Sequence, residues 1–119
     1  MPDGKAETEA LAAAERWLAL IDRGDAAASW AETARLFQAA VDEARWKESL
    51  EAAQRPIGRP VARSVRSMQY ATELPGAPDG EYVVLEFATT FEHKKNGAER
   101  VVMMKEPDGE WRTAGYYVR

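Results

Sequence analysis

Residues 82–93, Tyr-Val-Val-Leu-Glu-Phe-Ala-Thr-Thr-Phe-Glu-His, alternate between apolar and more polar side chains. One side of this stretch carries Val83, Leu85, Phe87, Thr89 and Phe91. A period of two residues is typical of a β-strand, whose successive side chains point to opposite faces. The stretch therefore predicts a strand that buries one face against a second layer of structure.

Further strands are predicted on both sides of this one. Residues 61–73 precede it, and residues 99–106 and 111–118 follow it with the same alternation. Asn96-Gly97 and Asp108-Gly109 are the dipeptides that tight hairpin turns prefer, because they tolerate the required backbone angles. We therefore expect a meander of about four antiparallel strands over residues 61–118.

The first half of the chain has a helical period instead. Residues 5–23 and 33–54 place apolar side chains three and four positions apart, and residues 25–31 read as a short helical turn. Gly24 can end the first helix, and Asp25 can cap the next. Asp42 can start a fresh helix, so 33–54 is expected to form two helices or one bent helix. The prediction is helices over about 6–54, with 1–5 as a loose end.

Helices followed by strands indicate an α+β fold, with the helices packed on one face of a curved antiparallel sheet. The chain has 119 residues, a common size for one domain, and two domains of ordinary size would not fit. We therefore expect a single α+β domain over residues 1–119, with one core shared by helices and sheet.

Composition removes several kinds of chemistry. The chain has no cysteine and one histidine, so disulfides, thiolate nucleophiles, iron–sulfur clusters and two-histidine metal sites within one chain are excluded. The net charge is −4, and residues 1–54 hold 6 basic and 11 acidic groups, without the broad basic surface that nucleic acid requires. No apolar run is long enough for a membrane span, and the start lacks an apolar export signal, so we expect either a cytoplasmic protein or one from which a leader has been removed. We expect no metal, no cofactor and no nucleic acid.

A set of short segments carries a resemblance to a known family. The segments are Trp17 to Asp25, Ser29-Trp30, Trp46 with Leu50, Arg55 to Gly58, Leu74-Pro75-Gly76, Asp108 to Arg112, and Gly115 to Arg119. In this order they resemble the bacterial family catalogued as domain of unknown function 4019, from about residue 8 to the C-terminus. The resemblance implies a periplasmic or secreted location, because members typically follow an export signal, although this chain shows none. It assigns no activity and no catalytic residue. The order of elements is also similar to the cone-shaped fold of nuclear transport factor 2 and ketosteroid isomerase.

No catalytic residue is predicted. His93 lies beside the predicted Asn96-Gly97 turn, where it is expected to be solvated rather than to act as a base. Acid–base chemistry of the isomerase type needs a carboxyl group among apolar neighbours with a hydroxyl donor opposite, such as Tyr116. Glu86 is the best acid for that role, and its exposure to solvent would remove the idea.

Arginine and aromatic residues supply the candidate ligand contacts. Arg59 and Arg63 could clamp a carboxylate or another anion, or could instead pair with the surplus acids of the helical half. Trp111, Tyr116 and Tyr117 lie on the last strand. Alternation groups Trp111 and Tyr117 with Thr113, Gly115 and Arg119 on one face, and Tyr116 with Arg112, Ala114 and Val118 on the other. One of the two sets should pack on the helices, and the other can form a contact surface.

Three functional hypotheses remain open. The favoured one is a non-catalytic module that binds a small ligand or a protein partner in the bacterial envelope. A second is an isomerase- or dehydratase-like enzyme with a buried acid and tyrosine inside the cone. A third is a structural homodimer formed through the outer face of the sheet.

Overall fold

The computed structural model describes residues 4–119, which form four helices followed by four strands. The helices are α1 (Lys5–Asp22), α2 (Ala26–Ala31), α3 (Arg35–Ala40) and α4 (Glu43–Gln54), and the strands are β1 (Pro60–Ala71), β2 (Tyr82–Phe91), β3 (Lys94–Lys105) and β4 (Trp111–Val118). The predicted α+β class and element order are confirmed. The predicted loose end falls partly on residues 1–3, which lie outside the described residues.

Both predicted aspartate caps are present at the starts of helices. The Asp25 carboxylate accepts a hydrogen bond from the backbone N–H of Ala28, and that of Asp42 accepts one from Arg45. Such caps satisfy amide donors that the first turn of a helix leaves free. They fix the boundaries of α2 and α4, and they separate residues 33–54 into two helices.

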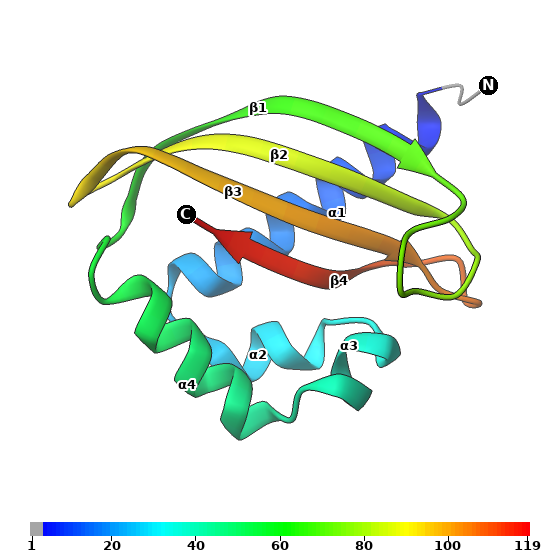
Figure 1. Ribbon diagram of the computed structural model, residues 1–119, viewed down its shortest axis with the longest axis horizontal. Helices are drawn as coiled ribbons and strands as arrows, with labels where there is room; N and C mark the ends of the chain where they lie inside the picture. Colours follow the sequence, from blue (N-terminus) through cyan, green and yellow to red (C-terminus); the bar gives the residue numbers. More distant parts are fainter. Residues whose placement is uncertain (1–3) are drawn as a thin grey trace.

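The strands form one open antiparallel sheet in the order β1-β2-β3-β4. Figure 1 shows α1 crossing behind the curved strands, while α2, α3 and α4 gather beyond β4. The inner face of the sheet therefore looks toward the helices. The face turned to the viewer, which we call the outer face, carries no helix (Figure 1).

The predicted turn at Asn96-Gly97 is wrong. The chain reverses at residues 92–93, Phe91 pairs with Lys94, and Gly97 lies inside β3 opposite Thr89. The backbone N–H groups of Glu92 and His93 donate to the carbonyls of Arg59 and Ile57, so the segment before β1 fixes this turn. Tertiary contacts thus outweigh the local turn preference. His93 is exposed there, as predicted.

The predicted faces of β4 are also wrong. Val102 pairs with Gly115 and Met103 pairs with Thr113, so Ala114 is an extra residue in a β-bulge. A one-residue bulge reverses the facing of every side chain beyond it. Tyr116 therefore joins Trp111 and Thr113 on the inner face, while Tyr117 points outward.

The edge of β4 is covered by the segment between α2 and α3. Thr33 forms an isolated bridge with Thr113, and the Ala34 N–H donates to the Thr113 carbonyl at 2.8 Å. This segment therefore protects the β4 edge at Thr113, and the opposite edge of the sheet is β1, a strand that begins at Pro60, which cannot donate a hydrogen bond.

Three aromatic rings occupy the core between the helices and the inner face. Trp17 lies 5.9 Å from Trp46 and 5.4 Å from Tyr116, measured between ring centroids. The indole N–H of Trp17 donates to the Ser29 carbonyl, and that of Trp46 donates to the Ser29 hydroxyl. The rings pack against one another between the helical layer and β4, which is the region where the isomerase hypothesis places its substrate.

Candidate functional site

A buried carboxylate, Glu99 on β3, is the centre of a polar cluster inside the fold. Its side chain is 1% exposed. One oxygen accepts from Arg63 Nε at 2.7 Å and from the Thr89 hydroxyl at 2.6 Å, and the other accepts from the Tyr116 hydroxyl. Donors from β1, β2 and β4 therefore converge on one acid of β3.

The charge of Glu99 is balanced by Arg63, which also binds the helical layer. The Arg63 guanidinium donates to both oxygens of Asp22, at 2.9 and 3.0 Å. Burial disfavours the charged form of Arg63, but hydrogen bonds to Asp22 and Glu99 outweigh this effect and hold its pKa above the ordinary value. The predicted pairing of this arginine with an acid of the helical half is thus present in the fold.

Tyr116 is held in its protonated form by the same cluster. Burial raises the pKa of Tyr116 well above its ordinary value, and the negative charge of Glu99 raises it further. The neutral phenol of Tyr116 therefore acts as the hydrogen-bond donor, and the carboxylate of Glu99 acts as the acceptor. Four hydrogen bonds from Arg63, Thr89 and Tyr116 already occupy the lone pairs of Glu99, which leaves this carboxylate no free acceptor site for a substrate donor.

Glu86, the acid that the sequence favoured, is not in the core. It lies on the outer face of β2, its side chain is 37% exposed, and it pairs with Arg100 of β3 at 3.4 Å. The exposure of Glu86 removes it as a buried acid. The acid inside the fold is Glu99, which the sequence analysis did not single out.

A groove of about 590 Å³ lies on the outer face of the sheet. Its floor is a row of three paired residues across β2, β3 and β4, namely Val84, Val102 and Gly115. The next row of paired residues, Glu86, Arg100 and Tyr117, forms one wall. We call this site the outer-face groove.

The opposite wall of the outer-face groove is the loop of residues 74–77. Beneath that loop, the fully buried Tyr82 donates its hydroxyl to the Pro78 carbonyl at 2.5 Å. The Gly80 N–H donates to the Thr72 carbonyl, which closes the base of the loop. These contacts hold the wall in place, so the groove is formed before any ligand arrives.

The predicted contact residues separate into different places. Arg63 and Tyr116 meet at Glu99 in the interior, whereas Tyr117, 62% exposed, lies in the outer-face groove with its ring over Gly115. Trp111 is buried and lines a second hollow, of about 480 Å³, between α1, α2 and β4.

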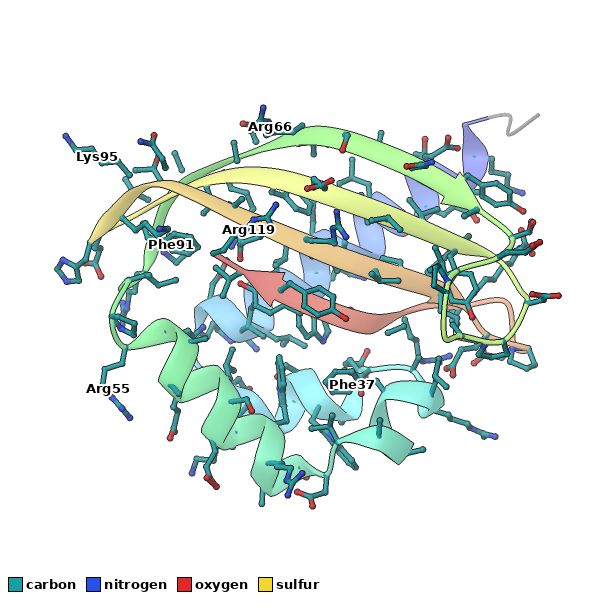
Figure 2. All side chains as sticks on the ribbon, viewed as in Figure 1. Phe37, Arg55, Arg66, Phe91, Lys95 and Arg119 are labelled. Carbon is teal, nitrogen blue, oxygen red and sulfur yellow. The ribbon has the colours of Figure 1, made fainter. Side chains whose placement is uncertain are left out.

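Arg59 does not form a clamp with Arg63. It lines a third hollow, of about 410 Å³, near the ends of α1 and α4. Arg55 lines the same hollow, but its side chain extends away from the fold (Figure 2). The acids Asp22 and Glu51 also line this hollow, which offsets its positive charge.

The sequence and the fold of this chain are both similar to those of known proteins. A family model described as "Protein of unknown function (DUF4019)" matches residues 13–116. The chain belongs to the DUF4019 family. No curated protein matches it.

Among solved structures, this DUF4019 protein is similar to a ketosteroid isomerase-like protein from Erwinia carotovora atroseptica SCRI1043. The TM-score is 0.59 with 16% identical residues, over 96% of this chain and 95% of that one. The likeness confirms the fold that the order of elements predicted, and it concerns the fold alone.

Residues 4–119 contain no group of three or more His, Asp or Glu side chains that could hold a metal ion. Within the same residues, no helix combines the length and apolarity needed to cross a bilayer.

Sequence alternation contained a signal for Glu99 that was overlooked. Glu99 lies two and four positions before Val101 and Met103 on the same strand, and both of these residues are buried. All three side chains therefore belong on the inner face. The predicted third strand began at residue 99, which made this acid look like a strand end. The wrong hairpin position therefore concealed Glu99, the acid that is buried among paired strands within residues 4–119.

Proposed function

We propose that this DUF4019 protein is a non-catalytic module of the bacterial envelope that captures a small ligand in the outer-face groove. The observation that carries the proposal is the contrast between the two faces of the sheet. On the inner face the acid Glu99 is fully hydrogen-bonded, and the hollow beside Met103, Trp111 and Thr113 has a volume of about 480 Å³, whereas the outer face offers a preformed groove of about 590 Å³. That volume falls in the range of small-molecule sites.

The interior argues for this proposal over the isomerase-like alternative. A buried acid and a tyrosine are both there, as that alternative requires, but Glu99 is paired with Arg63. A general base must be within reach of a substrate proton. Glu99 is among the residues that line the outer-face groove, but its side chain is 1% exposed and points to the inner face, and its donors Thr89, Arg63 and Tyr116 line none of the three hollows.

Charge on the outer face argues against the homodimer alternative. Arg100 and Arg119 line the outer-face groove, and Figure 2 places the Arg119 side chain beside β3. With the carboxylate of Glu86 counted, the side chains that point into the groove keep a surplus of positive charge, so two copies packed through this face would bring surfaces of like charge together, which disfavours association. We expect a monomer in size-exclusion chromatography.

A fragment screen followed by NMR tests the proposed binding site. Ligands should shift the amide signals of Val84, Val102 and Gly115 in the wild-type protein. The variant Val102→Trp places a large ring on the floor of the groove and should abolish these shifts, while Val61→Trp, at an exposed position outside the groove, should leave them intact. Ligands that map to the interior, or that bind Val102→Trp unchanged, would overturn the proposal.

The envelope location rests on the family resemblance and needs its own experiment. Expression of the natural gene in its host, followed by cell fractionation and immunoblotting, should recover the protein with periplasmic or secreted markers. Recovery with cytoplasmic markers would overturn this part of the proposal and leave the ligand site unaffected.

A further inference from the structure

We infer that the outer-face groove takes a small carboxylic acid with an apolar body, and that Arg100 binds the acid group in exchange for Glu86. This inference rests on the proposed function, because it names the ligand class of the same groove. It follows from the hydrogen-bonding state of Arg100, the charge of the groove and the composition of its floor.

Arg100 differs from the two arginines that are built into the fold. Arg63 donates through three nitrogens to Asp22 and Glu99, and Arg112 binds both Glu106 and Asp108. Arg100 makes one contact with Glu86, at 3.4 Å from one terminal nitrogen, and its side chain is 51% exposed. A guanidinium has five N–H donors, so most of those of Arg100 lack a side-chain acceptor within residues 4–119.

The existing ion pair is easily opened. Exposed pairs of this kind contribute little to stability, because solvent competes for both groups. A ligand carboxylate can present two oxygens to the fork of a guanidinium, a geometry that a single 3.4 Å contact does not use. When a ligand carboxylate takes the place of Glu86, Arg100 can make two hydrogen bonds instead of one, and this favours ligand binding.

The charge balance of the groove selects an acid over a base. Two guanidiniums, those of Arg100 and Arg119, line the outer-face groove. Among the side chains of the described residues that line the groove, the acid opposed to them is Glu86, because the side chain of Glu99 points to the inner face and is bound to Arg63. The surplus positive charge attracts one carboxylate and disfavours a cation.

The floor of the groove fixes the rest of the ligand. Val84, Val102 and Gly115 lie one row away from Arg100, at a spacing of about 6–7 Å for two residues along a strand. Leu74 and Pro75 close the far side. A carboxylate at Arg100 thus leaves an apolar body of a few carbons or one ring over the valines, under the loop and beside Tyr117.

Competition between Glu86 and the ligand predicts opposite effects for the two partners of the ion pair. Removing the charge of Glu86 should tighten acid binding, because Arg100 is then released. Removing Arg100 should weaken it, because the hydrogen-bond donor and positive charge that bind the carboxylate are lost. A site that Arg100 supports only structurally would not respond to Glu86→Gln with tighter binding.

The test is an NMR titration with hydrocinnamate and with its neutral amide, hydrocinnamamide, at low ionic strength. Hydrocinnamate should shift the amide signals of Val102 and Gly115 with a Kd at least about tenfold lower than the amide, since one charge-assisted pair is lost in the amide. Glu86→Gln should lower the Kd of the acid several-fold, and Arg100→Gln should raise it about tenfold. Arg66→Gln, an exposed arginine of β1 that lies outside the groove and points away from it (Figure 2), is the matched control and should leave the Kd unchanged.

The failure of this inference differs from failure of the proposed function. Equal binding of acid and amide in the groove, or weaker acid binding in Glu86→Gln, would overturn the acid class while leaving a ligand site there. Absence of any shift with hydrocinnamate would also overturn it, whatever the fragment screen finds. The exposed variants should unfold at the wild-type temperature, which separates lost binding from lost structure.

Discussion

Asp22, the last residue of α1, receives two hydrogen bonds from Arg63 of β1, whose guanidinium also binds Glu99 of β3. One side chain thus joins the helical layer to two strands. The arrangement places three charged groups in a partly dry environment, where each depends on the others for its solvation. Four predictions follow from this cluster and from the packing around it.

The Arg63→Met variant should lose about 3–5 kcal/mol of unfolding free energy, because Glu99 is then a buried charge without a partner. Urea denaturation measures the loss. The double variant Arg63→Met/Glu99→Gln should recover much of it, since no unpaired charge remains. Arg66→Met, at an exposed position on β1, should change the stability by less than about 0.5 kcal/mol. Equal stability of the two single variants would contradict the structural role of the cluster.

Alkaline pH should destabilise the protein through Tyr116. Its folded pKa lies above that of the unfolded chain, which is about 10. The contribution of Tyr116 to stability is therefore complete below pH 10, and it is lost as the pH rises and the unfolded phenol ionises. The slope should approach about 1.4 kcal/mol per pH unit for one proton.

The matched variant for this titration is Tyr116→Phe, which keeps the ring and removes the ionisable group. Urea denaturation at several pH values above 10 should give a shallower loss for Tyr116→Phe than for wild type. Parallel stability curves for the two proteins would show that Tyr116 ionises equally in the folded and unfolded states.

Ser29→Ala should remove the acceptor of a buried indole. The Ser29 hydroxyl is 2.9 Å from Trp46 Nε1, and Trp46 is 6% exposed. An unsatisfied buried donor costs about 1–3 kcal/mol, measured by urea denaturation with tryptophan fluorescence. Ser67→Ala, at an exposed site on β1, controls for the loss of a hydroxyl. The prediction fails if the two variants unfold at the same urea concentration.

Gly97→Ala should destabilise the β2–β3 hairpin. An added Cβ would lie 2.6 Å from the Phe91 ring and 2.8 Å from the Thr89 carbonyl oxygen, which is backbone and cannot move alone. Overpacking of this kind costs about 1–3 kcal/mol in thermal or urea unfolding. At Gly80 the nearest atom, in the Tyr82 ring, is 3.8 Å away, so Gly80→Ala is the control. A Gly97→Ala variant as stable as this control would contradict the position of the turn.

Much of the fold could be predicted from local patterns. The alternation of residues 82–93 predicted β2 and its apolar face. That face is the buried one in the structure, where Val83, Leu85 and Phe87 are almost fully buried. The caps at Asp25 and Asp42 were predictable because capping is a contact between residues two or three positions apart. Local signals of this kind survive folding when tertiary contacts do not oppose them.

The candidate sites could be predicted only in part. Arg63, Tyr116 and Tyr117 were singled out as contact residues, but their separation onto two faces depends on the bulge at Ala114. Glu99 was missed because the Asn96-Gly97 signal placed the start of β3 too late. The outer-face groove was not foreseen, because its walls come from a loop and from a row of residues on three different strands.

The amino-acid sequence alone determined the class of this fold, the order of its helices and strands, and the absence of cysteine chemistry. These features depend on residue type and on spacing within a few positions. Only the tertiary structure decided which acid is buried, which face Tyr116 takes and where the hairpin turns. Those outcomes depend on contacts such as Arg63 with Asp22, or His93 with Ile57, whose energies exist only after distant segments have met.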